Sequence, residues 1–406
     1  MKIAIIGLGY VGQVSAIALA AQGHSVLGID IDKAKVEGLR KGVPTIHEPK
    51  LKELLAKNVS HISFSTSYEG LADSEVAIIS VPTPTVNGKA ELKYVKEACK
   101  SAIAVNSKII VVIKSTVVPG TAKEIAKEIG IEVVSNPEFT QEGTALEDTL
   151  HPDRTVIGSV DSKAADIVER IWEFTGAPVI KTTNENAEMI KYASNAFLAT
   201  KISFINEIAD LCEKIPGGDV EVVAKGMGLD KRIAPRFLKA GIGYGGSCLP
   251  KDTQALVSFA KENGVSMGIV NAAIDANNQR VKRTLAHISY HLNGKFRGAK
   301  VGVLGIAFKG GTNDIRESQA LKIIEALKEE GAIVYAYDPV VKNEIEGVKL
   351  CGSIEEMVKN SDVVLVAAEW SEFEDLKAHL QDKPVVDARR VMNPKDYKNI
   401  RAIGLG

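Results

Sequence analysis

The segment GYGGSCLPKD, residues 243–252, places one cysteine among glycines and four residues before an aspartate. A glycine-rich loop is entropically costly, so we expect one where backbone must approach something closely. The next residues, PKDTQALVSFA, have a helical pattern, and N–H groups at a helix start favour a thiolate. Cys248 is therefore a candidate nucleophile, although most cysteines outside disulfides only fill space. Asp252 could equally complement the helix dipole, and Lys251 could be solvated.

Two further polar residues lie in a long apolar pattern of helical period, which predicts one helix from about Asn184 to Cys212. Lys191 and Asn195 are four residues apart and so share a face of it. A solvated stripe and a functional pair are both open at this point. Glu138 and Glu142, in NPEFTQEG, follow the fifth predicted strand, where an α/β sheet places its chemistry.

The histidines and the other cysteines suggest no metal site or disulfide. His287 and His291 share a helical face but have no third ligand nearby in sequence, so we predict surface histidines. The four cysteines show no C-x-x-C spacing. The absence of such pairs is typical of a protein from the reducing cytoplasm. We predict packing roles for Cys99, Cys212 and Cys351.

Composition excludes several classes of protein. With 406 residues, 45% of them hydrophobic, the chain is long enough for two or three domains with their own cores. Lys+Arg 50 against Asp+Glu 51 leaves a net charge of -1, which argues against a broad nucleic-acid or membrane-binding surface. No apolar run approaches the roughly 20 residues of a membrane span. The start, MKIAIIGLGYVG, is interrupted by glycines and predicts a strand and a turn, not a signal peptide.

The order of the patterns predicts an α/β fold with two Rossmann-like doubly wound domains, joined by the long central helix and a helical middle domain. Short β-branched runs alternate with helical patterns over residues 1–183, helical patterns dominate residues 184–293, and the alternation resumes over residues 294–406. The last part resembles the first: KVGVLGIAF is similar to MKIAIIGLGY, and GAIVYAYDP to GHSVLGIDID. Both sheets would offer ligand crevices at the carboxyl ends of their strands.

GLGYVG, between a predicted strand and a predicted helix, matches the dinucleotide fingerprint G-x-G-x-x-G. Its glycines permit a tight turn and close approach to a pyrophosphate, and the helix start supplies N–H groups. Asp30 ends the next strand, where its carboxylate would accept ribose hydroxyls and repel a 2′-phosphate, which favours NAD over NADP. The second copy spaces Gly302 and Gly305 differently, so we expect another ligand there. The motif's predicted cofactor contacts are Gly7, Gly9, Tyr10, Val11 and Gly12.

Several segments together resemble one known family. GLGYVG, SVPTP, KSTVVPGT, NPEFTQEG, HPDRTVIG, GIGYGGSCLPKD and GIAFKGGTNDIRES occur in the order seen in the UDP-glucose/GDP-mannose dehydrogenases, nearly end to end. The cysteine loop is the most specific part, because relatives that act on N-acetylated sugars usually carry histidine before the cysteine and no lysine–aspartate pair after it. DKRIAPRFLKAGIGYGG is most similar to the members that act on UDP-glucose.

The resemblance implies a four-electron oxidation of a sugar C6 alcohol to a carboxylate with two NAD⁺ in turn. Cys248 would hold the intermediate aldehyde as a thiohemiacetal and then as a thioester that water cleaves. Lys191 and Asn195 would stabilise negative charge on the substrate oxygen. Asp252 and Thr116 would order water and proton transfers, and Glu142 would assist hydrolysis.

The resemblance also implies binding residues. Arg232 would reach the substrate of a neighbouring subunit, which implies at least a homodimer through the helical middle, and Lys309 would lie where the C-terminal domain meets the nucleotide diphosphate. The implied NAD contacts are Asp30, Lys35, Thr83, Thr116, Glu142 and Arg316. The implied substrate contacts include Glu138, Lys191, Asn195, Lys201, Asn206 and the 237–246 segment with Phe237, Gly243, Tyr244 and Gly245.

Two departures from the family and several rival functions stay open. Gln141 replaces a common arginine and Asn313 a common aspartate, so one charge contact is in doubt at each place. A two-electron β-hydroxyacid dehydrogenase also carries a lysine and an asparagine four apart, but it explains neither Cys248 nor the third domain. A non-catalytic sensor of NAD or a nucleotide sugar explains none of the reactive residues. GDP-mannose and UDP-N-acetylmannosamine remain alternative substrates.

Overall fold

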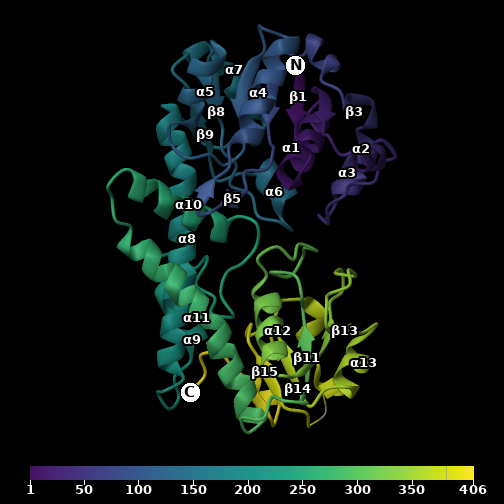
Figure 1. Cartoon of the computed structure of the whole chain (residues 1–406), viewed down its shortest axis with the longest axis vertical. Helices are drawn as coiled ribbons and strands as arrows, with labels where there is room; N and C mark the ends of the chain where they lie inside the picture. The colour runs from purple at the N-terminus through teal and green to yellow at the C-terminus, as the bar shows by residue number, and fades with distance from the viewer. Residues whose placement is uncertain (381) are drawn as a thin grey trace. The chain divides into compact units, whose positions relative to one another are not determined.

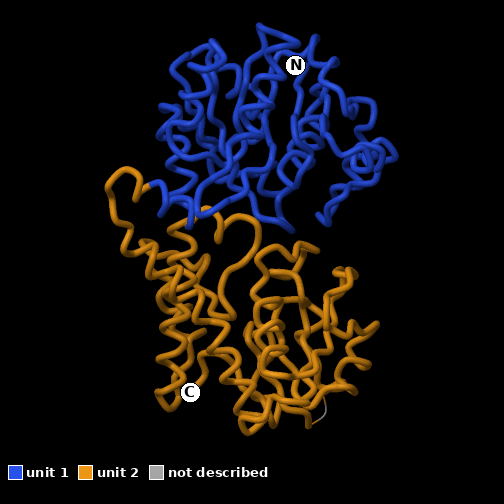
Figure 2. Tube along the Cα trace, in the orientation of Figure 1, with its two compact units in different colours: residues 1–194, 254–259 blue, residues 195–253, 260–406 orange. Residues whose placement is uncertain are grey.

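The computed structural model describes residues 1–380 and 382–406 and divides into two compact units (Figure 2). Unit 1 comprises residues 1–194 and 254–259, and unit 2 comprises residues 195–253 and 260–406. Two helices, α8 (Asn184–Cys212) and α10 (Leu249–Glu262), contribute to both units. Each unit contains a sheet flanked by helices (Figure 1).

The described strands of unit 1 form an eight-stranded sheet in the order β10-β9-β8-β7-β4-β1-β2-β3, parallel except between β8 and β9. Its six strands from β3 to β8 follow the doubly wound order 3-2-1-4-5-6. The central strands are buried on both faces, as β-branched runs beneath helices require. The strands are β1 (Lys2–Ile6), β2 (Ser25–Ile29), β3 (Ile62–Ser65), β4 (Val76–Ile79), β7 (Ile110–Ile113), β8 (Val133–Ser135), β9 (Thr155–Gly158) and β10 (Val179–Thr182), beside a hairpin of β5 (Thr85–Val86) and β6 (Lys89–Ala90).

The helices of unit 1 pack on this sheet through small and branched side chains. Residues 12–20 of α1 are all buried, because alanine and glycine let the helix approach the sheet closely. The helices are α1 (Tyr10–Ala21), α2 (Lys33–Arg40), α3 (Leu51–Lys57), α4 (Lys93–Val105), α5 (Thr121–Ile129), α6 (Ala145–Leu150) and α7 (Ser162–Trp172).

Unit 2 repeats the strand order, as the internal similarity predicted. Its described strands form a parallel six-stranded sheet, β13-β12-β11-β14-β15-β16, which is again 3-2-1-4-5-6. The predicted α/β class is therefore confirmed. The strands are β11 (Lys300–Leu304), β12 (Ile333–Tyr337), β13 (Val348–Leu350), β14 (Val363–Val366), β15 (Val385–Asp387) and β16 (Ile400–Ala402), and the helices beside them are α12 (Gln319–Glu329), α13 (Ile354–Lys359) and α14 (Lys377–Leu380).

The helical part of unit 2 consists of residues 195–212 of α8, α9 (Val220–Gly228), residues 249–253 and 260–262 of α10, and α11 (Gly268–His291). The prediction of one helix from Asn184 to Cys212 is confirmed. Ser203 donates a hydrogen bond to the carbonyl of Ala273, and Arg280 pairs with Asp210 at 2.7 Å, so α8 and α11 are joined by polar contacts. In the described part of the chain, no helix is long and apolar enough to cross a membrane.

Candidate active site

The turn between β1 and α1 has the shape that a dinucleotide requires. Gly7 has φ +91°, and a Cβ there would lie 2.7 Å from the carbonyl oxygen of Ser80. A Cβ at Gly12 would overlap the Gly7 carbonyl oxygen, whereas one at Gly9 would meet no described atom within 4 Å. Side chains of the described residues neither cap α1 nor place an acid in its first turn. The helix start therefore presents N–H groups and open space to an anion such as a pyrophosphate.

Asp30 follows β2 beside this turn, as predicted. One carboxylate oxygen accepts from the Leu8 N–H (2.7 Å) and the Lys35 ammonium (2.9 Å), and the other accepts from the Asp32 N–H (2.9 Å). Burial would raise the pKa of Asp30, but these hydrogen bonds hold it below its ordinary value. The carboxylate is thus ionised at neutral pH, which suits ribose hydroxyls and opposes a phosphate.

The second sheet has an acid at the corresponding position. Asp338 follows β12, and one of its oxygens accepts from the N–H groups of Ile306 (2.8 Å) and Ala307 (3.2 Å), just after β11. Its other oxygen accepts from Val340 and Val341. Asp338 thus repeats a contact of Asp30 in unit 1, which likewise accepts from the N–H two residues after the first strand, at Leu8.

Cys248 directly precedes α10, as the sequence predicted. Its carbonyl accepts the first helical bond, from the Asp252 N–H at 2.9 Å, so the cysteine occupies the N-cap position. Its thiol sulfur lies 3.6 Å from the Ser247 hydroxyl, and the residue is partly exposed. A thiolate at this position faces the positive end of the helix dipole.

The carboxylate of Asp252 is almost completely buried, at 1% exposure, and each of its oxygens accepts a hydrogen bond. One oxygen accepts from the Asn195 amide at 2.6 Å, and the other accepts from the Lys251 ammonium at 2.5 Å. Lys251, which the sequence left without a role, therefore neutralises Asp252. Because burial makes an unpaired charge very unfavourable, this pairing fixes both Asp252 and the orientation of Asn195.

The glycine loop before the cysteine is held by α11. The Asn277 side chain accepts from the Tyr244 N–H at 2.8 Å and donates to the Tyr244 carbonyl at 3.0 Å. Gly243 has φ +99°, and a Cβ there would overlap the amide oxygen of Asn277. Glycine is thus required for backbone conformation and for the asparagine's close approach. No local sequence pattern indicated this role of Asn277.

Two predicted substrate-binding residues of α8, Lys201 and Asn206, form hydrogen bonds with the backbone of residues 233–241. The Lys201 ammonium donates to the carbonyl of Ile233 at 3.0 Å, and the Asn206 side chain accepts from the Gly241 N–H at 2.8 Å. Between these anchors, Phe237 has φ +66°, a strained value for a bulky residue. Lys201 and Asn206 therefore shape the 233–241 backbone.

In unit 1, Lys191 forms a buried ion pair with Glu138, with 2.8 Å between its ammonium and the carboxylate. Both side chains are less than a tenth exposed, so Lys191 does not belong to a solvated stripe. Burial alone would raise the pKa of Glu138, but the charge of Lys191 and hydrogen bonds from Lys191 and Thr140 lower it to about 2. The Glu138 carboxylate is therefore ionised throughout the physiological range.

Lys114 is a second buried cation that the sequence reasoning missed. It lies 4.3 Å from the Trp172 ring centroid and 3.3 Å from the Asn136 amide oxygen. Burial lowers the pKa of Lys114 to about 8, with the charge of Lys191 acting in the same direction and that of Glu138 against it. Its place at the end of a buried strand, in the KST segment, was the available signal.

Glu142 lies in a loop whose backbone donates hydrogen bonds to Glu48. The buried carboxylate of Glu48 accepts from the Gly143 N–H (2.9 Å), the Leu146 N–H (3.1 Å) and the Tyr10 hydroxyl (2.5 Å). Tyr10 is the first residue of α1, so Glu48 joins the Glu142 loop to the cofactor turn. Nothing in the local sequence around Glu48 indicates this.

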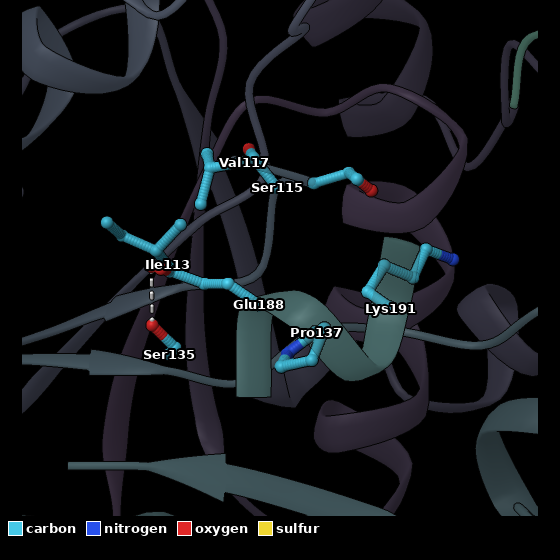
Figure 3. A pocket seen from close by; sticks show the side chains of 8 residues that line it. Ile113, Ser115, Val117, Ser135, Pro137, Glu188 and Lys191 are labelled. Carbon is cyan, nitrogen blue, oxygen red and sulfur yellow. Dashed lines mark hydrogen bonds between the residues drawn. The ribbon is translucent and has the colours of Figure 1, made fainter. Parts of the chain in front are cut away.

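Thr116 and Lys191 line one small pocket of unit 1, together with residues from the ends of β7 and β8 (Figure 3). Glu188 of α8 also projects into it and accepts from the Ser135 hydroxyl at 3.0 Å. A predicted proton-transfer residue and a predicted charge-stabilising residue thus share one pocket.

The structure divides the predicted residues between the two units. Arg232 is exposed and pairs with Asp230, Arg316 pairs with Asp314, and the Lys309 ammonium lies 5.8 Å from the Phe308 ring centroid. Unit 1 contains the GLGYVG turn with Asp30, Lys35, Thr83, Thr116, Glu138, Glu142 and Lys191. Unit 2 contains Asn195, Lys201, Asn206, Arg232, the 237–246 segment, Cys248, Asp252, Lys309 and Arg316.

One sequence prediction outside these groups was wrong. His287 is buried rather than at the surface, with one ring nitrogen 3.2 Å from the Glu213 carboxylate and the other accepting from Arg401. Helical spacing identified its face but not what packs on it. Among the described residues, no three histidine, cysteine, aspartate or glutamate side chains form a group that could hold a metal ion, and no cysteine is in a disulfide.

The turn, the ionised acid after β2 and the doubly wound sheet define unit 1 as the cofactor domain of an NAD-dependent dehydrogenase. Three domain models of one family match consecutive parts of the chain: its NAD binding domain at residues 1–175, its central domain at 185–279 and its UDP binding domain at 302–394. The chain belongs to the UDP-glucose/GDP-mannose dehydrogenase family. The family resemblance, the NAD cofactor and the enzyme class predicted from the sequence are confirmed.

Individual relatives support the same family assignment. UDP-glucose 6-dehydrogenase YwqF of Bacillus subtilis is 43% identical over 391 residues, covering 92% of this chain and 88% of the relative. A UDP-glucose dehydrogenase structure from Pyrobaculum islandicum has a TM-score of 0.93 at 37% identity, covering 100% of this chain and 98% of that one. A UDP-D-ManNAc dehydrogenase structure from Pyrococcus horikoshii has a TM-score of 0.89 at 30% identity, covering 100% and 99%.

Proposed function

We propose that this chain is a UDP-glucose 6-dehydrogenase, which oxidises UDP-glucose to UDP-glucuronate with two NAD⁺. The observation that carries the proposal is Cys248 at the start of α10, one turn before the buried Asp252 that Asn195 and Lys251 hold. A two-electron dehydrogenase has no use for this thiol. Ser247 before the cysteine, and lysine–aspartate after it, favour UDP-glucose over N-acetylated sugars.

In the first oxidation, the C6 hydroxyl loses its proton as a hydride leaves C6. Bound at the GLGYVG turn and Asp30, NAD⁺ would supply the hydride acceptor for each of the two oxidations. The Lys191 ammonium and the Asn195 amide stabilise the negative charge that develops on the C6 oxygen. Asp252 orders the water that takes the proton, because its own carboxylate is held on both sides.

In the second oxidation, the Cys248 thiolate adds to the aldehyde carbon and forms a C–S bond, so the reactive aldehyde is not released. Loss of the second hydride converts this thiohemiacetal to a thioester. Water then adds to the thioester carbonyl with assistance from Glu142 and Thr116. The C–S bond breaks, the thiolate leaves, and the product is a carboxylate.

The stoichiometry of NADH formation tests this function. Purified protein with excess NAD⁺ is offered UDP-glucose, GDP-mannose and UDP-N-acetylmannosamine separately, and NADH formed per sugar nucleotide consumed is measured. We expect two NADH per UDP-glucose and much slower reaction with the other two. One NADH per substrate would indicate a two-electron dehydrogenase, and no turnover with any of them would favour a non-catalytic sensor.

The remaining binding and domain assignments are part of the same proposal. The cofactor contacts beyond the turn, the substrate contacts in both units, the domains at residues 1–183, 184–293 and 294–406, and a cytoplasmic location follow from the sequence and the family resemblance. Lys309 is assigned to the nucleotide diphosphate because its charge suits that group.

A homodimer through α8 is also proposed. One face of α8 is apolar and exposed: Phe197, Phe204 and Leu211 recur every seven residues and are 64%, 45% and 57% exposed. Residues at this spacing share a helical face, and such an apolar stripe is unfavourable in water. A second copy of the chain presents the same stripe and can cover it with twofold symmetry.

Charge placed in this stripe is expected to separate the subunits. In sedimentation equilibrium, the wild type should have twice the chain mass of 43.4 kDa, and Phe197→Glu/Phe204→Glu should shift toward the single mass. Val160→Glu, which alters an equally apolar residue 80% exposed in unit 1, serves as the control. A double variant that keeps the wild-type mass would exclude α8 as the interface.

A further inference from the structure

We propose that Glu188 is a positioning residue that holds three reactive segments of unit 1 together: the loop that carries Thr116, the Asn136–Glu138 segment, and the turn of α8 that carries Lys191. This inference rests on the proposed function, since it assumes that those segments act on the substrate. No step of the mechanism above uses Glu188. Figure 3 shows Glu188 in the pocket, joined to Ser135.

Glu188 is only 3% exposed and accepts three hydrogen bonds. One carboxylate oxygen accepts from the Gly120 N–H at 2.6 Å, and the other accepts from the Ala122 N–H at 2.9 Å and the Ser135 hydroxyl at 3.0 Å. Gly120 is the N-cap of α5, has φ +94° and provides no side-chain cap. The carboxylate therefore caps α5 from another helix, where it also meets the positive end of the dipole.

Each contact fixes a segment that the mechanism requires. Gly120 ends the loop that begins after β7 and contains Thr116. Ser135 is the last residue of β8 and directly precedes the Asn136–Glu138 segment. Lys191 lies three residues beyond Glu188 on the same face of α8. Displacement of one carboxylate would thus move three segments, and misplacement of reacting groups by about 1 Å can lower a rate about 100-fold.

Opposing effects act on the pKa of Glu188. Burial raises its pKa to about 7, with Glu185 acting in the same direction, although the backbone N–H groups favour the anion. Because the folded-state pKa is above the ordinary 4.5, this group's contribution to stability is full below pH 4.5 and is lost as pH rises through about 7. Among the charged residues of these elements, Glu185 and Lys191 lie on α8 near Glu188, α5 carries Lys123, Glu124, Lys127 and Glu128, and Lys114 and Glu138 follow β7 and β8.

The test is Glu188→Gln, which keeps the side-chain size but turns one acceptor into a donor. One of the three hydrogen-bond donors then faces an NH₂ group. We expect kcat with UDP-glucose to fall about 10- to 100-fold, while KM for UDP-glucose and for NAD⁺ stays within about twofold. Glu185→Gln is the matched control, since it removes an exposed carboxylate from the same turn and an ion pair with Lys123, and its kcat should be unchanged.

Amide hydrogen exchange provides a readout that does not depend on activity. In Glu188→Gln, amides of residues 115–122 and 136–140 should exchange faster than in the wild type. Unchanged exchange in either segment would overturn the proposal. So would faster exchange with an unaltered kcat, because Glu188 would then only cap a helix.

A milder variant covers the case in which Glu188→Gln does not fold. Ser135→Ala removes one donor and leaves the two backbone N–H groups, so kcat should fall severalfold and residues 136–140 should exchange faster. Normal kcat and exchange in this variant would also overturn the proposal. The wild type could oxidise no nucleotide sugar while amide exchange in the two variants changes as expected. The proposed function would then be refuted, whereas the role of Glu188 in holding the segments together would be supported.

Discussion

Cys248→Ser should lose about 10⁴-fold or more in kcat for the full oxidation. A serine hydroxyl at the start of α10 is not ionised near neutral pH, so it cannot add to the aldehyde as a thiolate does. NAD binding should stay intact, because the cofactor turn and Asp30 lie in unit 1, whereas Cys248 lies in unit 2. The loss should therefore be in turnover and not in cofactor affinity.

The measurement combines steady-state NADH formation with titration of NAD⁺ binding to each variant. Cys351→Ser is the matched control, because it makes the same change at a partly buried cysteine next to β13. We expect the control to react like the wild type. A Cys248→Ser variant that still forms two NADH per UDP-glucose at the normal rate would refute the covalent mechanism.

Lys191→Met should have the second large effect, on both activity and stability. Removing the ammonium should lower kcat about 10²- to 10³-fold, as expected for one group that stabilises charge on a reacting oxygen. It also leaves the Glu138 carboxylate as an unpaired buried charge. Breaking a buried ion pair in this way typically costs about 3–5 kcal/mol of unfolding free energy.

The pH dependence of stability distinguishes this loss from a general packing defect. In the wild type the pKa of Glu138 is lowered to about 2, so the pair stabilises the fold above the ordinary 4.5 and loses that contribution only as pH falls through about 2. Without Lys191, burial favours protonated Glu138. The destabilisation in urea unfolding should therefore be larger at pH 7.5 than at pH 4.

Two further variants complete the experiment. Lys191→Met/Glu138→Gln removes both charges, so it should recover much of the stability but none of the activity. Lys181→Met removes an exposed lysine that pairs with Asp166 and Glu169, and should cost under about 1 kcal/mol. Equal destabilisation at both pH values in Lys191→Met would show that Glu138 does not depend on its partner's charge.

Local patterns were sufficient for much of this protein. The alternation of strand and helix patterns predicted both doubly wound sheets, and the uninterrupted apolar periodicity predicted α8 from Asn184 to Cys212. GLGYVG followed by Asp30 predicted the cofactor turn. The cysteine before a helical pattern predicted that Cys248 would lie at a helix start. These features depend on residues close in sequence, whose propensities and spacing act without distant partners.

The same periodicity did not show which face of α8 would be buried. It left open whether Lys191 and Asn195 form a solvated stripe, yet both face the interior, while Phe197 and Phe204 are exposed. The polar residues are buried because partners distant in sequence, Glu138 and Asp252, pair with them. Burial of a polar group is favourable only when such partners are present, and local sequence does not identify them.

By itself, the sequence determined the α/β class, the two sheets, the cofactor turn and the place of Cys248 at a helix start, since each is specified by a short pattern. Only the tertiary structure decided that Lys251 and Asn195 hold Asp252, that Asn277 holds the glycine loop, and that Glu48 and Glu188 join loops of unit 1. The physical reason is that a buried carboxylate or amide must be satisfied by hydrogen bonds, and packing brings its partners from tens of residues away.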